Sequence, residues 1–234
     1  GGDLAQAVEN AAAGSTLVLQ GSCVVGTQDG GDAPWVIDKA LTIQGGSITV
    51  WPGGIVLKDD VTFQNTVIGF SSNMRNAIIA NGHTLTLDGV TCSASSAYSI
   101  NLFCGGLLDS NNEGFDDYLP ASGSTGTVIV RGNTNLQGRQ ATSTGNIYAG
   151  NLCMGLSMDS AGPANAYDGN PSIQAEGLTG TGSGAIGTIY ACGAQQRNGD
   201  GGAGKITLPD PDNYTVNGAV SVILGRSGTP AQGQ

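Results

Sequence analysis

The sequence predicts an all-β fold, a single-stranded parallel β-helix (solenoid) that begins with one short α-helix. From residue 15 onward, apolar segments of about four residues end at Gly, Asn or Asp, and new segments start about every seven to ten residues. Short strands with frequent turns are typical of sandwiches, barrels and solenoids. Similar segments also recur at a longer period of about 44 residues, and this internal repetition favours a solenoid.

Residues 3–14, DLAQAVENAAAG, form the one segment with a convincing helical pattern. Asp3 is an N-cap with Gln6 three residues later, and Gly14 suits the C-terminal end. The apolar stripe at helical spacing consists of Leu4, Ala7, Val8, Ala11 and Ala12. An open β-helix end exposes unpaired backbone groups and apolar interior. We therefore expect residues 4–13 to lie across the first coil as a capping helix.

Short strands are expected in the segments that follow the helix, because each segment alternates or is wholly apolar and is bounded by turn residues. These segments are STLVLQG (15–21), PWVIDKALTIQGGSITVWPGG (34–54), IVLKDDVTFQNTVIGF (55–70) and AIIANGHTLTLDGV (77–90).

The longer repeat pairs a strand ending in a glycine turn with a second strand ending in Ala-Gly or Cys-Gly. Gly89, Gly132 and Gly177 mark its first half at separations of 43 and 45 residues. The period equals two coils of ~22 residues or one propeller blade, and the short, uneven strands favour the coils. We expect about ten coils, with Cys104, Ala149 and Cys192 in equivalent internal positions. The β-helix domain would span residues 1–228, with residues 15–228 forming the coils and residues 229–234 a linker or C-terminal tail.

The net charge of −10 excludes several classes of partner. So few basic residues could not neutralise a row of phosphates, so no nucleic acid partner is expected. They are also scattered, and no apolar run approaches the ~20 residues of a membrane span, so no membrane insertion is expected. The acidic balance and abundant Asn, Thr and Ser suit a monomeric secreted or surface protein. The abrupt ends at Gly1-Gly2 and SGTPAQGQ suggest a piece of a longer protein.

Five cysteines occur without any CxxC pair, at positions 23, 92, 104, 153 and 192. This pattern does not favour a zinc site, and an odd number leaves one cysteine outside any set of disulfides. Burial as small hydrophobic residues is the expected role.

Two stretches near the N-terminus resemble the opening of the pectate-lyase-like right-handed β-helix superfamily. They are GSTLVL (14–19), which follows the amphipathic helix, and KALTIQG (39–45). The segments NGHTLTLDG (81–89), NIYAGN (146–151) and TIYACGA (188–194) resemble adhesin-like repetitive surface proteins of Gram-positive gut bacteria. The resemblance implies a right-handed β-helix with an extracellular or cell-wall-attached location. It does not fix an activity.

The acidic stretch DSNNEGFDDYLP (109–120) has alternating oxygen ligands at Asp109, Asn111 and Glu113, with Gly114 next and Asp116 behind. Such alternation is typical of calcium loops. Position 12 of that motif is Pro120 rather than a bidentate Glu. We therefore predict a solvated insertion between coils and assign no metal ligand, with calcium kept as the alternative cofactor.

No catalytic residue is predicted. Asp59-Asp60 and Asp116-Asp117 are adjacent acid pairs, but neighbours in a strand point to opposite faces, and Asp59-Asp60 suits a turn. Glycosidases of the superfamily carry Gly-His-Gly and Arg-x-Lys elements, whereas His83 lies in Asn-Gly-His-Thr and no Arg-x-Lys occurs. A lyase-type basic groove is difficult to assemble here, and Arg131 and Arg139 are expected to be solvated. The chain has no G-x-S-x-G elbow for a serine nucleophile.

Binding residues are left unassigned. Aromatic side chains spread along the chain could stack on sugars or anchor a protein, while partial burial is the plainer expectation, especially for Tyr148 and Tyr190 at equivalent positions. The set is Trp35, Trp51, Tyr98, Tyr118, Tyr148, Tyr167, Tyr190 and Tyr214. Residues 157–172 and 195–205 are expected as protruding loops, where recognition by solenoids usually resides.

The sequence therefore favours a non-enzymatic module of a larger bacterial surface protein, an adhesin that binds a host glycoprotein, protein or glycan. The alternative is a carbohydrate-active enzyme, a polysaccharide lyase or glycoside hydrolase on the same scaffold. A purely structural stalk is the third hypothesis.

Overall fold

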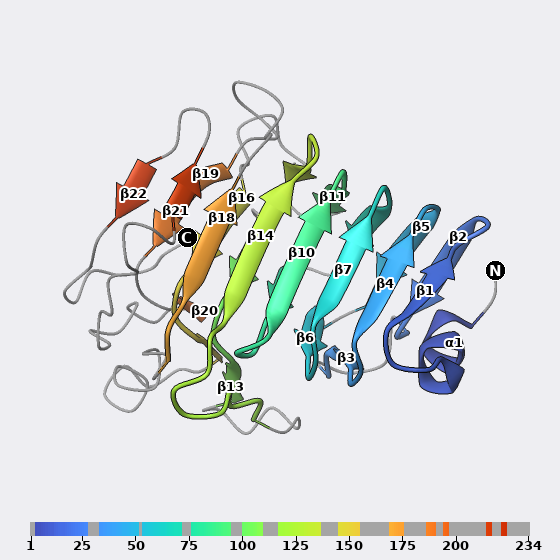
Figure 1. The fold of residues 1–234 in the computed structure, drawn as a ribbon, viewed down its shortest axis with the longest axis horizontal. Helices are drawn as coiled ribbons and strands as arrows, with labels where there is room; N and C mark the ends of the chain where they lie inside the picture. The colour runs from blue at the N-terminus through green and yellow to red at the C-terminus, as the bar shows by residue number, and fades with distance from the viewer. Residues whose placement is uncertain are drawn as a thin grey trace.

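Three long parallel sheets dominate the fold, and the chain visits them in turn (Figure 1). The computed structural model describes residues 3–27, 33–51, 53–71, 76–94, 100–109, 117–136, 145–154, 169–175, 186–190, 194–196, 214–216 and 221–223. In the first three circuits the chain passes from sheet A to sheet B to sheet C and returns to sheet A, and the fourth and fifth circuits pass through a shorter sheet D before they return. Each strand therefore pairs in parallel with its equivalent one circuit later.

The strands of each sheet follow one another along the long axis of the molecule. Sheet A contains β1 (Ser15–Val18), β4 (Leu41–Gln44), β7 (Val61–Gln64), β10 (Thr84–Asp88), β14 (Thr127–Arg131), β18 (Ser172–Ala175) and β21 (Tyr214–Val216). Sheet B contains β2 (Ser22–Val25), β5 (Ser47–Val50), β8 (Val67–Phe70), β11 (Thr91–Ala94) and β15 (Asn135–Leu136). Sheet C contains β3 (Trp35–Ile37), β6 (Ile55–Leu57), β9 (Ala77–Ile79), β12 (Asn101–Phe103), β16 (Gly145–Tyr148), β19 (Ile186–Tyr190) and β22 (Ser221–Ile223). A shorter sheet D contains β13 (Leu107–Asp109), β17 (Leu152–Met154) and β20 (Ala194–Gln196).

The described chain is thus mostly β, with parallel sheets and a single short helix, as the sequence predicts. A parallel solenoid is consistent with this arrangement. In the part of the chain that the structure describes, no helix has the length and apolarity needed to cross a membrane.

The repeat of about 44 residues corresponds to one circuit and not to the two coils that we expected. Thr84 of β10 pairs with Thr127 of β14, which pairs with Ser172 of β18. Earlier circuits are shorter, since Leu41, Val61 and Leu85 are successive partners. The later circuits add the strands of sheet D, which lengthens them without disturbing the pairing in sheet A. Sheets A and C each hold seven strands among the described residues, compared with about ten expected coils.

Alternation along each strand builds the core. In sheet A the inward side chains Ile43, Phe63, Leu87 and Val130 are 0% exposed and lie in one in-register column. Burying a side chain of this size contributes about 1.5–3 kcal/mol. Because the pairing is parallel and in register, each inward residue packs above its equivalent in the next circuit. The columns therefore form one continuous apolar interior.

A left-handed residue turns the chain from sheet A toward sheet B in four successive circuits. Gly45, Asn65, Gly89 and Gly132 each follow the last residue of a sheet A strand and have φ of 76°, 48°, 65° and 69°. Glycine adopts this conformation without a steric cost, and asparagine tolerates it. The predicted glycine turns at Gly89 and Gly132 are confirmed, while Gly177 lies outside the described residues.

The helix α1 (Leu4–Asn10) covers the first circuit through Leu4 and Val8, which are buried in the main core. The Asp3 side chain accepts a hydrogen bond from the Gln6 N–H at 3.1 Å, which confirms the predicted N-cap. The helix ends at Asn10 rather than at the predicted residue 14. Ala11 is already extended, and the Gly14 N–H bonds the Ala40 carbonyl, so these residues join the sheet ladder.

Lys39 holds the C-terminal end of α1 from the next circuit. Its ammonium donates to the carbonyls of Glu9 at 2.6 Å and Ala11 at 3.1 Å. Carbonyls at a helix C-terminus lack intrahelical partners and carry partial negative charge, so a lysine there satisfies both needs.

A second apolar cluster lies on the outward face of sheet C. Val56, Ile79, Phe103 and Tyr148 are successive partners there, and Leu107 and Leu152 of sheet D pack against them. The rings of Phe103 and Tyr148 stack with centroids 4.6 Å apart. Tyr148 and Tyr190 are register partners, as predicted, and the role of Tyr148 is structural packing.

We predict that Gly132→Ala lowers the free energy of unfolding by about 2–4 kcal/mol, because a left-handed alanine is strained and its Cβ would meet Asp88 and the backbone of Gly89. Gly123 also has positive φ but no neighbour within 4 Å, so Gly123→Ala should cost only about 1–2 kcal/mol. Gly21→Ala, which meets nothing within 4 Å, should leave stability unchanged or slightly raised. Urea denaturation gives all three values, and equal costs at 123 and 132 would contradict the close approach of circuits.

We also predict that Lys39→Met destabilises the protein by about 1–2 kcal/mol, because the helix carbonyls lose a charged donor while the aliphatic stem is kept. Lys58→Met is the matched control, since the Lys58 ammonium lies over the Tyr118 ring, 5.6 Å from its centroid. That loss should be below about 1 kcal/mol.

Removal of residues 1–13 should expose the first circuit and cause self-association, which analytical ultracentrifugation measures. A monomeric truncation would refute the capping role.

Candidate functional site

The candidate site lies in the turns that lead from sheet C into sheet A. Leu41, Val61 and Leu85 are successive partners, so the residues two positions earlier stand above one another in the same way. Those residues are Lys39, Asp59 and His83. A single column therefore carries a cation, an acid and an imidazole in three consecutive circuits.

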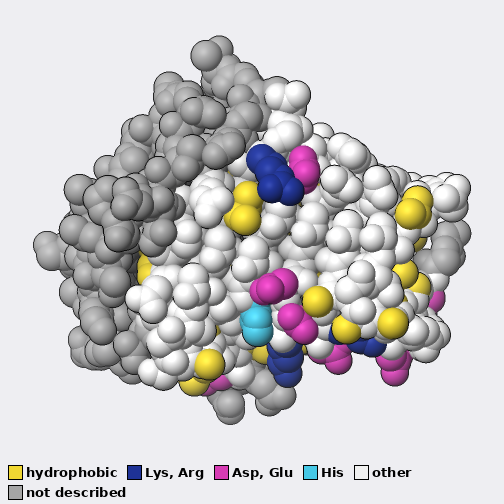
Figure 2. All heavy atoms as spheres, viewed as in Figure 1, with side chains coloured by type: hydrophobic (Ala, Val, Ile, Leu, Met, Phe, Trp, Pro, Cys, Tyr) yellow, Lys and Arg dark blue, Asp and Glu magenta, His cyan; other side chains and the backbone are white. Residues whose placement is uncertain are grey.

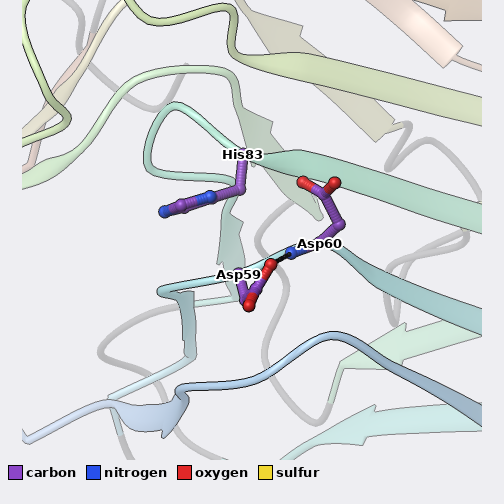
Figure 3. Close-up of side chains that lie close together, drawn as sticks. All are labelled: Asp59, Asp60 and His83. Carbon is purple, nitrogen blue, oxygen red and sulfur yellow. Dashed lines mark hydrogen bonds between the residues drawn. The ribbon is translucent and has the colours of Figure 1, made fainter. Parts of the chain in front are cut away.

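Asp59, Asp60 and His83 form a compact cluster at this position. One ligand atom from each lies within 4.8 Å of the others. Asp60 is exposed, and Asp59 and His83 are half-buried. Figure 2 shows the chain's only histidine beside two acidic side chains at one edge of the face formed by sheet A. Figure 3 shows that the two carboxylates come from one turn and the imidazole from the turn of the following circuit.

Hydrogen bonds fix one oxygen of each carboxylate. The Asp60 N–H donates to Asp59 Oδ1 at 2.8 Å, which is the dashed contact in Figure 3. The Thr84 N–H donates to Asp60 Oδ1 at 2.7 Å, so the next circuit orients Asp60. His83 is held by its backbone, which bonds Ala80 and Thr127. Among the described residues, no further protein group hydrogen-bonds the second carboxylate oxygens or the imidazole nitrogens.

The negative charge of the cluster is not balanced by the nearest lysines. Lys39 bonds the carbonyls of helix α1, and Lys58 lies over the Tyr118 ring. Neither carboxylate forms an ion pair with a lysine or arginine in the described part of the chain. Two carboxylates at this separation repel each other, which makes the cluster attractive to a cation.

The sequence patterns did not predict that Asp59, Asp60 and His83 lie together. Asp59 and Asp60 do lie in a turn, as predicted, and one ligand atom of each lies within 4.8 Å of one ligand atom of His83 from the next circuit. Alignment of KALTIQ (39–44), DDVTFQ (59–64) and HTLTLD (83–88) places Lys39, Asp59 and His83 in register, with Asp60 next to Asp59. His83 by itself carries no such signal, because its acidic neighbours come from the preceding circuit.

The acidic stretch is described only at its ends. Asp109 ends β13, while Asn111, Glu113, Gly114 and Asp116 lie outside the described residues. Leu107 and Tyr118 form an antiparallel bridge with backbone hydrogen bonds of 2.9 and 2.7 Å. The stretch therefore leaves and returns at one point on the surface of sheet D, and the calcium alternative stays a prediction.

The other candidate binding residues are scattered. Arg131 is half exposed and pairs with Asp88 at 3.2 Å, whereas Arg139 lies outside the described residues. Trp35, Trp51 and Tyr118 are half-buried. The predicted loops at 157–172 and 195–205 lie mostly outside the described residues, as do Tyr98, Tyr167 and Cys192.

The described cysteines are free, and Cys92, Cys104 and Cys153 are buried, as predicted. Burial raises the pKa of Cys92 and of Cys104 to about 12, because the thiolate cannot be solvated in the core. At neutral pH these thiols are therefore protonated, and they are poor nucleophiles and poor metal ligands.

We predict that stability falls as pH rises above about 9. The unfolded thiols lose their protons near the ordinary value of 9.0, while Cys92 and Cys104 keep theirs up to about 12. The folded state then binds more protons than the unfolded state, so the contribution is complete below pH 9 and is lost between about 9 and 12. In this window each thiol lowers the free energy of unfolding by up to ~1.4 kcal/mol per pH unit. Urea denaturation at pH 8 and 10 under reducing conditions should show a smaller decrease for Cys92→Ala, and an equal decrease would contradict the assignment.

Comparisons with protein-family models, curated proteins and solved structures return no match for this chain. The similarity to the pectate-lyase-like superfamily stays a prediction from the sequence. The geometry of the described residues is therefore the basis for any statement about what this chain does.

Proposed function

We propose that the chain is a right-handed parallel β-helix module of a bacterial cell-surface protein, and that it acts as an adhesin without catalysis. Its ligand would be a host glycan, carried as such or on a glycoprotein, with a host protein as the alternative. The observation that carries this proposal is the outward face of sheet A. This face presents the same polar groups in successive circuits.

The order of the strands supports the β-helix. Successive strands enter sheets A, B and C in turn, and all pairings in these three sheets are parallel. Connections between parallel strands are right-handed in nearly all proteins, which supports the right-handed form. An acidic, lysine-poor composition supports an extracellular or cell-wall-attached location.

Two polar rows run along the outward face of sheet A. The first row consists of the register partners Thr16, Thr42 and Thr62, and the next partner in this column, Thr86, is buried. The second row consists of Gln44, Gln64, Asp88 and Arg131. Neighbouring strands lie ~4.8 Å apart, so each row offers hydrogen-bonding groups at a constant interval. Figure 2 shows few hydrophobic and few charged side chains on this face.

The second row is held in place by its own hydrogen bonds. Gln64 Nε2 donates to Asp88 Oδ2 at 3.5 Å, and Arg131 Nε donates to the same oxygen at 3.2 Å. Side chains fixed on strands lose little further freedom when they bind a ligand. Amide and hydroxyl groups both donate and accept hydrogen bonds, and a carboxylate accepts them, so an extended chain of sugar hydroxyls could contact several circuits at once.

A carbohydrate-active enzyme is the second candidate function, and the cluster of Asp59, Asp60 and His83 is the observation that favours it. Two carboxylates and an imidazole are groups that general acid–base chemistry uses. The cluster lies at the edge of the same face, so a bound glycan would pass close to it.

We predict that the protein binds a subset of glycans on an array, and that replacing Gln44 and Gln64 together by Ala weakens this binding about 10- to 100-fold. Each replacement removes a hydrogen bond worth about 1 kcal/mol. The matched control is Thr49→Ala with Thr91→Ala, which removes polar side chains from the outward face of sheet B and should leave binding unchanged.

A polysaccharide-degradation screen separates the two candidates. Binding without released oligosaccharide supports the adhesin, whereas release that is lost in Asp60→Asn would establish the enzyme instead. An array without any signal would argue against a glycan ligand and favour the alternative, a host protein.

A further inference from the structure

We propose that Asp59, Asp60 and His83 bind one divalent transition-metal cation of the zinc class. This metal would join two consecutive circuits, because the carboxylates belong to the turn before β7 and the imidazole to the turn before β10. The proposal concerns the edge of sheet A and is independent of what the face binds.

The donor atoms are close enough to share a cation. They lie within 4.8 Å of one another, and a zinc-class metal with bonds of ~2.0–2.2 Å spans ligand pairs up to about 4.2 Å apart. Asp60 is exposed, so a small rotation of its side chain closes the remaining gap. Half-burial of Asp59 and His83 limits their freedom, which reduces the entropic cost of assembling the site.

The free donor atoms and their supports fit a metal centre. One oxygen of each carboxylate is oriented by a backbone N–H, which leaves the other oxygen for the cation. Outer hydrogen bonds of this kind orient metal ligands in proteins. The adjacent lysines bond elsewhere, so the cation would supply the positive charge that the carboxylate pair lacks.

The imidazole selects the class of metal. Calcium and magnesium prefer oxygen ligands, and calcium takes six to eight of them. Two carboxylates and one imidazole instead suit zinc and neighbouring first-row cations, with water completing the coordination. Three protein ligands also leave an open position, where a donor group of a second molecule could bind.

The experiment is isothermal titration calorimetry of the untagged, chelator-treated protein with ZnCl₂ and with CaCl₂. We expect one zinc equivalent with calcium binding far more weakly, and at least a ~10-fold loss of zinc affinity for His83→Gln and for Asp60→Asn. Asp38→Asn is the matched control, because Asp38 is an exposed acid in the preceding turn, outside the cluster. Its affinity should equal that of the unmodified protein.

A second readout excludes binding at thiols. Because the chain has one histidine, its imidazole gives a single Hε1 resonance, which zinc should shift in the unmodified protein and in Asp38→Asn. At zinc near 100 times its Kd, the melting temperature should rise by about 5–10 °C, since the metal holds two circuits together. Unchanged zinc affinity in His83→Gln, an unmoved imidazole signal, or equal affinity for calcium would overturn the proposal.

Discussion

In-register parallel pairing between successive circuits is the constraint on which the rest of this structure depends. A residue on one circuit is hydrogen-bonded beside its equivalent on the next, so a choice of side chain at one position is repeated along the axis. An inward apolar residue becomes a column of the core, and an outward threonine becomes a row on the surface. A single polar residue that turned inward would face apolar neighbours on both sides. The alternation of buried and half-buried residues in β4 and β7 follows from this condition.

The left-handed corner after each sheet A strand keeps that register while the length of the circuit changes. The four corner residues Gly45, Asn65, Gly89 and Gly132 have the same sign of φ, although the circuits between them differ more than twofold in length. Extra residues enter after sheet B and after sheet C, where the corner is not repeated. Sheet D and the outward apolar cluster of sheet C arise from these additions, since Leu107 and Leu152 cover Phe103 and Tyr148. The insertions thus bury their own apolar surface instead of disturbing the main core.

Local patterns were sufficient to predict much of the fold. Turn residues and alternation located the strands, and Asp3 with Gln6 located the start of the helix. The predicted end of the helix was wrong because Gly14 hydrogen-bonds the Ala40 carbonyl at the start of the sheet. This contact joins positions far apart in the sequence. The predicted length of one circuit was wrong for a related reason. A period in the sequence does not say which strands pair, and only the register shows that Thr84 lies beside Thr127. The cluster of Asp59, Asp60 and His83 escaped notice because its members are separated by one circuit.

The stacking of turns explains why this cluster of two acids and a histidine arises at the edge of sheet A and not on its flat face. On a strand, adjacent side chains point to opposite sides, so a doublet of acids contributes one carboxylate to each face. In the turn before β7, Asp59 and Asp60 each bring one carboxylate oxygen into the same cluster, and the stacking of circuits adds His83 from the next turn. The same stacking places Lys39 in the preceding turn, but its ammonium donates hydrogen bonds to carbonyls at the end of α1. The cap of the solenoid and the charge of the cluster are therefore coupled. By engaging the nearest lysine of the column, the helix leaves two carboxylates and an imidazole available for a cation.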